Sequence, residues 1–503
     1  MSTDDINDHE VKQRAIAQKK KQTSGFFKSM TISWGLIKLR GLIFNKIFTN
    51  YLDQNEFGRF NFLIQTATFL GSFGTSGLSG AIFRFTSVYT EEKNRRKISN
   101  LIITSLILAT GFYIIITGVY LVLVSMEFFS FKNFNTIVVV LVGSFGFFYL
   151  LQNLSNAYIQ AQRRFLSYVI VNVAVVYSNL IIAVLFVFFS EPGANELVLS
   201  YVLSHGFFIS IYFLKIIFDN GLGSFSKEEL TNVVKYSAPT LIISPFYNLF
   251  NYLQYFLLTF FAGEQAVALF VICLSVIGFL NIIVNPISSA FSSLQYSLFD
   301  SNEHDYLKSL INKMTRVYMA LLVPIIVLFW YNAPFLIEIL SNSEFVNSET
   351  VLGTLILGFS FLFKALLHFT CQGPYFFKKT PEISLLYLRA VIIAGISSLI
   401  IVPIFGLLGM CTSFLLHDFF RWFFVFPFSQ KVFRIKYSLV RILSIGIPTM
   451  FFLTVSLVSE IIFGLPSLLA SICGLLSYLI ILFSLKITGV NETKQLMRQL
   501  LKR

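Results

Sequence analysis

Charged residues are scarce in this 503-residue chain, where Asp, Glu, Lys and Arg together make up 13% of the sequence. A soluble globular protein is about one quarter charged. Hydrophobic residues account for 55% of the chain, and its mean hydropathy is +0.74. Its apolar stretches run well beyond the roughly 18 residues that predict a membrane span. The scarcity of charge therefore excludes a soluble globular domain and predicts an all-α polytopic membrane protein.

Cysteine is also rare, and the four cysteines fall inside predicted spans without CxxC spacing. They are Cys273, Cys371, Cys411 and Cys473. Cysteines placed in this way are expected to be small apolar residues with free thiols. The sequence therefore predicts no zinc site and no cofactor.

The first 30 residues lack the apolar core of a cleavable signal peptide. We expect a cytoplasmic tail there, whose cations attract anionic membrane lipid by about 1 kcal/mol each. The net charge of the whole chain is +13. The positive-inside rule alone gives a polytopic protein many cytoplasmic Lys and Arg, and no basic domain lies outside the predicted spans. Nucleic acid is therefore not an expected partner.

Basic gaps alternate along the chain with gaps that contain almost no cation. Residues 91–97, 163–164 and 378–379 are basic, whereas residues 126–134, 191–196 and 406–407 contain a single Lys between them. Because Lys and Arg stay on the cytoplasmic side, this alternation sets the direction of every span. It predicts a plasma (inner) membrane protein with about fourteen spans and both termini in the cytoplasm.

The spans fall into two predicted lobes of six helices, followed by two more helices. The expected division is a cytoplasmic tail at 1–30, a first lobe at 31–218, a cytoplasmic linker at 219–235, a second lobe at 236–430, two further spans at 431–486 and a cytoplasmic tail at 487–503. In the linker, Ser226 and Glu229 have capping-box spacing, which predicts a short amphipathic helix at the membrane surface. An ordinary loop is the alternative.

Two similar turns indicate an internal repeat. Residues 50–60 and residues 260–270 each read as a helix, a tight acidic turn on the outer side and a second helix. Six spans separate the two units, so they are expected to be parallel repeats. Two lobes related in this way enclose a cavity that can open to either side of the membrane.

Several ionisable residues lie within the spans, where a charge costs about 2.5–3.5 kcal/mol at the bilayer centre. They are Lys38, Arg40 and Lys46 in span one, His205 in span six, Lys364 and His368 in span ten, Arg389 in span eleven, and His417, Asp418 and Arg421 in span twelve. Cations exceed anions in this set, which predicts a cavity for an anion such as a phosphate. The histidines and Asp418 are candidates for a protonation switch that couples transport.

Simpler interpretations of these polar residues remain open. Lys38 and Arg389 lie close enough to the cytoplasmic ends of their helices to snorkel, and Arg421 can pair with Asp418. Amides recur in other spans, at Gln152, Asn153, Asn156, Asn248, Asn251, Gln254, Asn281 and Asn285. They suit sugar hydroxyls, or they form hydrogen bonds between helices, worth about 0.6 kcal/mol each in a membrane.

Five segments resemble the polysaccharide-biosynthesis flippases of the multidrug/oligosaccharidyl-lipid/polysaccharide exporter superfamily. They are Asn55–Phe60, Gly77–Phe85, Ala161–Phe165, Tyr236–Thr240 and Val402–Met410, which occur in the same order as in that family. The resemblance covers nearly the whole chain. At one position the chain departs from the family: Gln254-Tyr255 stands in span seven where the family often has Asp-Arg, so the coupling role of that Asp is not carried over.

The resemblance implies a non-enzymatic flippase with two lobes and alternating access. It would move a polyprenyl-pyrophosphate-linked oligosaccharide, such as an O-antigen, capsule or exopolysaccharide unit, to the outer leaflet, with polymerase or assembly proteins as further partners. A drug or metabolite antiporter of the same superfamily is one alternative, although its substrates are often cationic. A membrane polysaccharide polymerase is another, although the short predicted outer gaps leave little room for a catalytic domain.

Overall fold

The computed structural model describes residues 35–125, 136–162, 164–189, 193–282, 302–377 and 379–485, with a few single positions between 283 and 301. Throughout these residues the regular secondary structure is helical, and no strand is present. Nine of the described helices are long and apolar enough to cross a membrane. The predicted all-α polytopic membrane fold is therefore confirmed. The predicted tails at 1–30 and 487–503, together with Asn285, lie outside the described residues.

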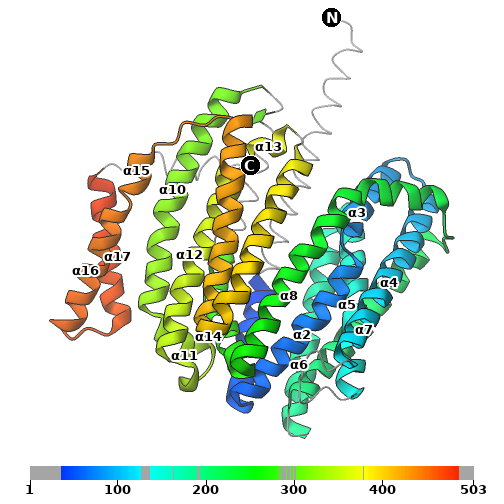
Figure 1. Ribbon diagram of the computed structural model, residues 1–503, viewed down its shortest axis with the longest axis horizontal. Helices are drawn as coiled ribbons and strands as arrows, with labels where there is room; N and C mark the ends of the chain where they lie inside the picture. Colours follow the sequence, from blue (N-terminus) through cyan, green and yellow to red (C-terminus); the bar gives the residue numbers. More distant parts are fainter. Residues whose placement is uncertain are drawn as a thin grey trace, which may run out of the picture.

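Figure 1 shows the order of the helices along the chain. After a helix over residues 35–51 come α2 (Gln54–Gly74), α3 (Leu78–Glu91), α4 (Arg95–Ser125), α5 (Thr136–Ala161), α6 (Phe165–Phe189), α7 (Ala194–Asn220), α8 (Lys227–Gly278), α10 (His304–Tyr331), α11 (Ala333–Leu340), α12 (Ser348–Thr370), α13 (Gly373–Phe376), α14 (Thr380–Val432), α15 (Leu439–Leu443), α16 (Gly446–Ile461) and α17 (Ser467–Ser484).

Two of the long helices each contain two crossings. Gly263 has a φ of 84° within α8, and Gly406 has a φ of 51° within α14. Glycine adopts positive φ without the steric cost that other residues incur, so each glycine ends one helix and starts the next. The helix at 35–51, α2 and α16 are shorter or less apolar than the other crossings. With these helices included, the described part of the chain accounts for the fourteen predicted spans.

The second predicted span is interrupted in the structure. The apolar stretch over residues 59–83 predicts one continuous helix, but α2 ends at Gly74 and α3 begins at Leu78. Between them Gly77 has a φ of 73°, which a helix cannot accommodate. The neighbouring Gly74 lies at a close contact between helices, because an added Cβ would be 2.9 Å from the Ala109 carbonyl oxygen of α4.

The predicted linker helix is present, but it is continuous with the next span. The Ser226 hydroxyl caps α8 by accepting a hydrogen bond from the Glu229 amide at 3.3 Å. The Glu229 carboxylate does not reach back to complete a capping box; it accepts a hydrogen bond from the Tyr89 hydroxyl of α3 at 3.0 Å. Burial raises the pKa of the Glu229 carboxyl. The first turns of α8 cross the end of the bundle beside α3 (Figure 1). The hydrogen bond between Tyr89 and Glu229 holds them there.

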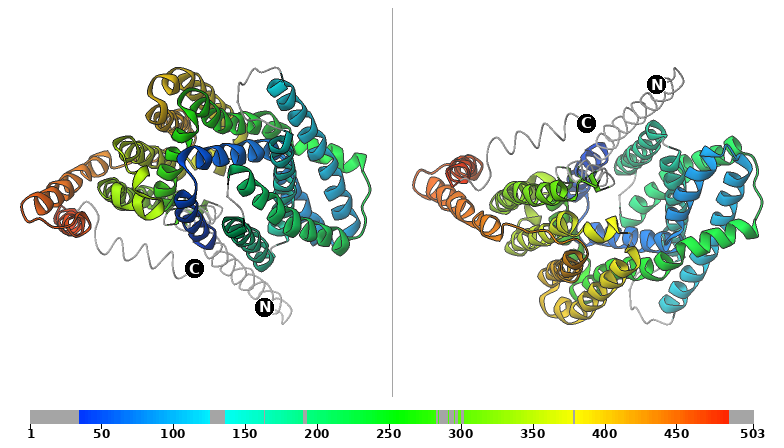
Figure 2. Two further views of the ribbon diagram at one scale, coloured as in Figure 1. Left: turned by 90° about the horizontal axis from the view of Figure 1, so that it is seen from below. Right: turned by 90° about the horizontal axis from the view of Figure 1, so that it is seen from above.

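The helices pack as two groups that meet along α2 and α8. The first group contains α3 to α7 together with the helix at 35–51, whose Arg40 donates hydrogen bonds to α6 and α7. The second group contains α10 to α14. The pair α16 and α17 packs beside α10, far from α2 to α5 (Figure 2). One end of the bundle carries Asp53, Glu264 and Glu344 and is called the acidic end; the opposite end, which carries Arg95 and Lys431, is called the basic end.

The two predicted repeat turns meet at the acidic end. The side-chain amide of Gln265 donates to the side-chain oxygen of Gln54 at 2.6 Å. Beside this pair, α2 passes so close to α8 that a Cβ added at Gly58 would overlap the carbonyl oxygen of Glu264. Small residues permit such close approach of helix backbones in membranes. Gly58 therefore determines how closely the two groups of helices meet.

We expect Gly58→Ala to destabilise the protein by about 1–3 kcal/mol, because overpacking a close backbone contact has a cost of this size. Thermal unfolding of the detergent-purified protein measures the change. Gly80→Ala is the matched control: Gly80 is also helical, but its nearest neighbour would be 3.9 Å from an added Cβ. That variant should be neutral or slightly more stable, because Ala is favoured over Gly in helices. Equal stability of the two variants would contradict the assigned packing role of Gly58.

Candidate functional site

A buried carboxylate lies at the centre of the ionisable residues on α12 and α14. Asp418 is 7% exposed, and one of its oxygens accepts a hydrogen bond from the Ser360 hydroxyl at 2.8 Å. Its other oxygen lies 3.4 Å from the His417 ring and 3.4 Å from the Arg421 guanidinium. A buried charge is tolerated only when it has polar or charged partners, and Asp418 has three of them in Ser360, His417 and Arg421.

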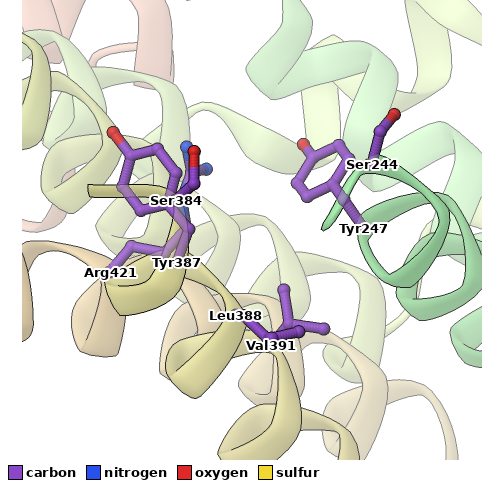
Figure 3. A pocket seen from close by; sticks show the side chains of 7 residues that line it. All are labelled: Ser244, Tyr247, Ser384, Tyr387, Leu388, Val391 and Arg421. Atoms are coloured by element: carbon purple, nitrogen blue, oxygen red, sulfur yellow. The ribbon is translucent and has the colours of Figure 1, made fainter. Parts of the chain in front are cut away.

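Arg421 also faces a cavity in the second group of helices. The cavity has a volume of about 290 Å³ and is lined by Ser244, Tyr247, Ser384, Tyr387, Leu388, Val391 and Arg421. The guanidinium lies over the Tyr387 ring at 4.5 Å and the Tyr247 ring at 5.8 Å. In Figure 3, Ser244 and Tyr247 of α8 stand on one side, and Ser384, Tyr387 and Arg421 of α14 on the other. The cavity therefore combines one cation with hydroxyl groups and aromatic rings.

Two lysines from different groups of helices extend this cationic region. Lys364 of α12 lies one turn after Ser360 and is exposed. It interacts electrostatically with Lys38 of the helix at 35–51 and with His417. The Lys38 ammonium lies close to α8, 3.3 Å from where a Cβ on Gly278 would be. Two like charges held close together favour the binding of an anion, because a nearby opposite charge stabilises both charged groups.

His368 lies one turn beyond Lys364 on α12, as the spacing predicts. Its ring makes an edge-on contact with Phe369 at 5.6 Å. Its side chain is only partly buried. A coupling role for His368, as for His417 and Asp418, stays a prediction.

Arg40 and His205 lie together in the interior of the first group of helices. The Arg40 guanidinium donates to the Val176 carbonyl oxygen at 3.0 Å and to the Tyr201 hydroxyl at 3.2 Å, and it lies over the Phe44 ring at 4.2 Å. The His205 ring lies 2.9 Å from the Tyr201 carbonyl oxygen. These contacts join the helix at 35–51 to α6 and α7. The structure therefore does not bring Arg40 or His205 to the Asp418 cluster.

Lys46 is positioned at the acidic end. Its ammonium donates to the carbonyl oxygens of Glu338 at 2.8 Å and Ser341 at 2.6 Å. These carbonyls lie at the C-terminal end of α11, where the helix dipole favours a cation. Nearby, the Asn342 amide donates to the Thr49 carbonyl oxygen at 2.6 Å. Lys46 therefore connects the two groups of helices, and the structure separates it from Lys38.

Arg389 lies on an outer surface of α14. It is exposed, and the apolar residues one turn before and one turn after it, Leu385 and Ile392, are 49% and 47% exposed. An arginine surrounded by exposed apolar side chains on a membrane helix extends toward the lipid headgroups. The structure agrees with the snorkelling alternative for this residue.

Several amides in the spans form hydrogen bonds to other segments, whereas Asn251 and Asn281 donate to carbonyl oxygens of their own helix. Gln152 donates to Asn172 at 3.1 Å, Gln254 donates to Ser398 at 2.6 Å, and Asn248 donates to Ser76 at 3.4 Å. These contacts agree with the second interpretation of the amides, in which they join neighbouring segments of the protein rather than bind sugar hydroxyls. Conversely, no motif or charge in the sequence distinguishes Ser360, Tyr247 or Tyr387. Only the four-residue spacing between Ser360 and Lys364 indicated that the serine shares the face of a charged residue.

Solved structures of transporters share this fold. The lipid II flippase MurJ in an inward closed conformation is 15% identical, with a TM-score of 0.68 over 92% of this chain and 99% of that chain. An inward-facing multidrug resistance MATE family transporter of the MOP superfamily is also 15% identical, with a TM-score of 0.61 over 80% of this chain and 94% of that one. At these identities the similarity shows the fold alone. No curated protein sequence matches the chain.

The sequence itself shows the family. The profile of the polysaccharide biosynthesis protein family matches residues 27–294, which is more than half of the chain. The match includes the helix at 35–51, the helices α2 to α7 and all of α8, so it covers both repeat turns that meet at the acidic end. The resemblance found in the sequence is thus confirmed, and the chain belongs to the polysaccharide biosynthesis protein family.

Proposed function

We propose that this protein moves a polyprenyl-pyrophosphate-linked oligosaccharide from the cytoplasmic to the outer leaflet of the plasma (inner) membrane. The main support for this proposal is the cationic region formed by Lys38, Lys364 and Arg421, which come from three different segments of the chain. The substrate is the repeat unit of an O-antigen, a capsule or an exopolysaccharide. The family of the chain and the fold of its structural neighbours support a transporter of this kind.

The balance of charge in this region favours an anionic substrate. Asp418 is already paired with Ser360, His417 and Arg421, so its negative charge is not available to neutralise the lysines. Lys38 and Lys364 repel one another. A pyrophosphate would remove this repulsion by accepting charge-assisted hydrogen bonds from both ammonium groups. The lipid tail would remain in the bilayer while the head group occupies the site.

The contacts at the acidic end support alternating access. Lys46 and Asn342 form hydrogen bonds between the two groups of helices, and Gln54 donates to the Glu344 carbonyl oxygen at 2.9 Å. By the positive-inside rule the basic end faces the cytoplasm, so these contacts close the outer side. Outward movement of the anion is then favoured by the membrane potential, by roughly 2.3 kcal/mol per charge per 100 mV.

The same observation disfavours an antiporter for cationic drugs. A cationic substrate would be repelled by Lys38 and Lys364, and Asp418, which could attract it, is only 7% exposed. A polysaccharide polymerase is also disfavoured, because the described loop between α11 and α12 is short and its Asn342 is committed to a contact between helices. A non-enzymatic flippase accounts for both features.

Deletion of the gene in its host tests the proposed function. We expect lipid-linked oligosaccharide to accumulate on the cytoplasmic side and surface glycan to fall, because the unit is made but not moved. Extraction of lipid-linked oligosaccharides, with mass spectrometry, measures the accumulation. Expression of the chain from a plasmid should reverse both effects. Normal surface glycan without accumulation of the intermediate would show that this function is wrong.

Substitution of the two lysines tests the substrate site. We expect Lys38→Gln and Lys364→Gln each to lower complementation of the deletion at least roughly tenfold, because a hydrogen bond to a charged group contributes about 1.5–3 kcal/mol. The control is Lys215→Gln, which removes an exposed cation of α7. Surface glycan normalised to the amount of membrane-inserted protein is the readout. If all three variants complement equally, the lysines do not bind the substrate.

A further inference from the structure

We propose that the cavity beside Arg421 binds one acidic sugar of the oligosaccharide through the carboxylate of that sugar. This inference rests on the proposed function and assigns a second subsite to the same substrate. The cavity lies within the second group of helices, between α8 and the two halves of α14. Lys38 and Lys364 do not line it. The pyrophosphate and the sugar would therefore occupy neighbouring but different places.

The cation of a buried ion pair forms part of the cavity wall. Arg421 lines it and its side chain is 17% exposed, whereas the side chain of its partner Asp418 is 10% exposed and does not line it. Arg421 approaches Asp418 at 3.4 Å through one nitrogen. The guanidinium also shares a hydrogen bond with the Tyr387 side chain. Because a guanidinium has five N–H donors, and the Arg421 Nε has no hydrogen-bond partner among the described residues, the group remains able to bind a second carboxylate. Arginine and carboxylate match in geometry as well as in charge.

The remaining wall of the cavity suits a sugar ring. Tyr247 and Tyr387 contribute aromatic rings, and Ser244 and Ser384 contribute hydroxyl groups that donate and accept hydrogen bonds. The other lining residues, Leu388 and Val391, are apolar. A small-molecule pocket typically combines apolar and aromatic walls with a few polar groups that fix orientation. At about 290 Å³, the cavity is of the size of one monosaccharide rather than of a longer glycan.

This composition fits a carboxylate sugar better than a pyrophosphate. A pyrophosphate carries several negative charges, and only one of the residues that line the cavity is a cation. Two cations stand together outside the cavity, at Lys38 and Lys364. His417 connects the two places, because its ring lies 5.8 Å from the Tyr247 ring of the cavity and it interacts electrostatically with Lys364. One lipid-linked substrate would therefore contact both subsites at once.

Binding of free sugars to the full-length purified protein in lipid nanodiscs tests the inference. The probes are glucuronate, glucose and inorganic pyrophosphate, followed by saturation-transfer NMR. We expect glucuronate to bind at least roughly tenfold more tightly than glucose, because only glucuronate has a carboxylate for Arg421. We also expect pyrophosphate to leave glucuronate bound. Equal binding of the two sugars, or displacement of glucuronate by pyrophosphate, would overturn the proposal.

Two variants locate the sugar. Arg421→Gln removes the cation, but it also leaves Asp418 with one partner fewer. Ser384→Leu fills the cavity and leaves every charge in place, so it is the decisive variant. Its matched control is Ser397→Leu, on the same helix and outside the cavity lining. We expect Ser384→Leu to lose glucuronate binding while it keeps pyrophosphate binding, and Ser397→Leu to keep both.

The sugar measurement is independent of transport. Retention of glucuronate binding by Ser384→Leu shows that the cavity is not the sugar site, whatever the outcome of the gene deletion. Conversely, a deletion without accumulation of lipid-linked oligosaccharide disproves the flippase function even if glucuronate binds. The two failures are therefore distinguishable.

Discussion

The close approach of α2 to α8 at Gly58 is the contact on which the arrangement of the two groups of helices depends. Because a side chain there would overlap the Glu264 carbonyl, the absence of a Cβ allows the two repeat turns to touch. The hydrogen bonds of Lys46 and Asn342 across the two groups lie at the same end. With that end held closed, the proposed flippase would receive its substrate from the basic side, where the cations of the proposed site would bind it.

Much of the fold could be predicted from the sequence, because a bilayer imposes simple rules of length and charge on every span. The alternating basic gaps gave the number of crossings, and the acidic turns around Asp53 and Glu264 indicated the repeat. The break at Gly77 and the continuity of α8 through residue 235 could not be predicted in this way. Both depend on local backbone geometry and on contacts such as that of Glu229 with Tyr89, which hydropathy does not report.

The site was only partly predictable for a related reason. The cost of burying a charge indicates that an ionisable residue needs a partner, but it does not indicate which partner. Lys46 donates to carbonyl oxygens, and Arg40 contacts a carbonyl, a hydroxyl and a ring, whereas Lys38 and Lys364 repel one another. Tyr247 and Tyr387 carry no charge, so nothing in their sequence context distinguished them from the many other aromatic residues of the spans.

The claim that links fold to function is that Lys38 and Lys364 together bind the pyrophosphate of a lipid carrier. The most direct measurement is the affinity of the purified protein for farnesyl pyrophosphate, compared with farnesol, which has the same tail and no phosphate. The proposed site predicts saturable binding of the pyrophosphate that weakens with salt and is lost in the double variant Lys38→Gln/Lys364→Gln. Equal affinity for farnesol, or unchanged binding in the double variant, would contradict it.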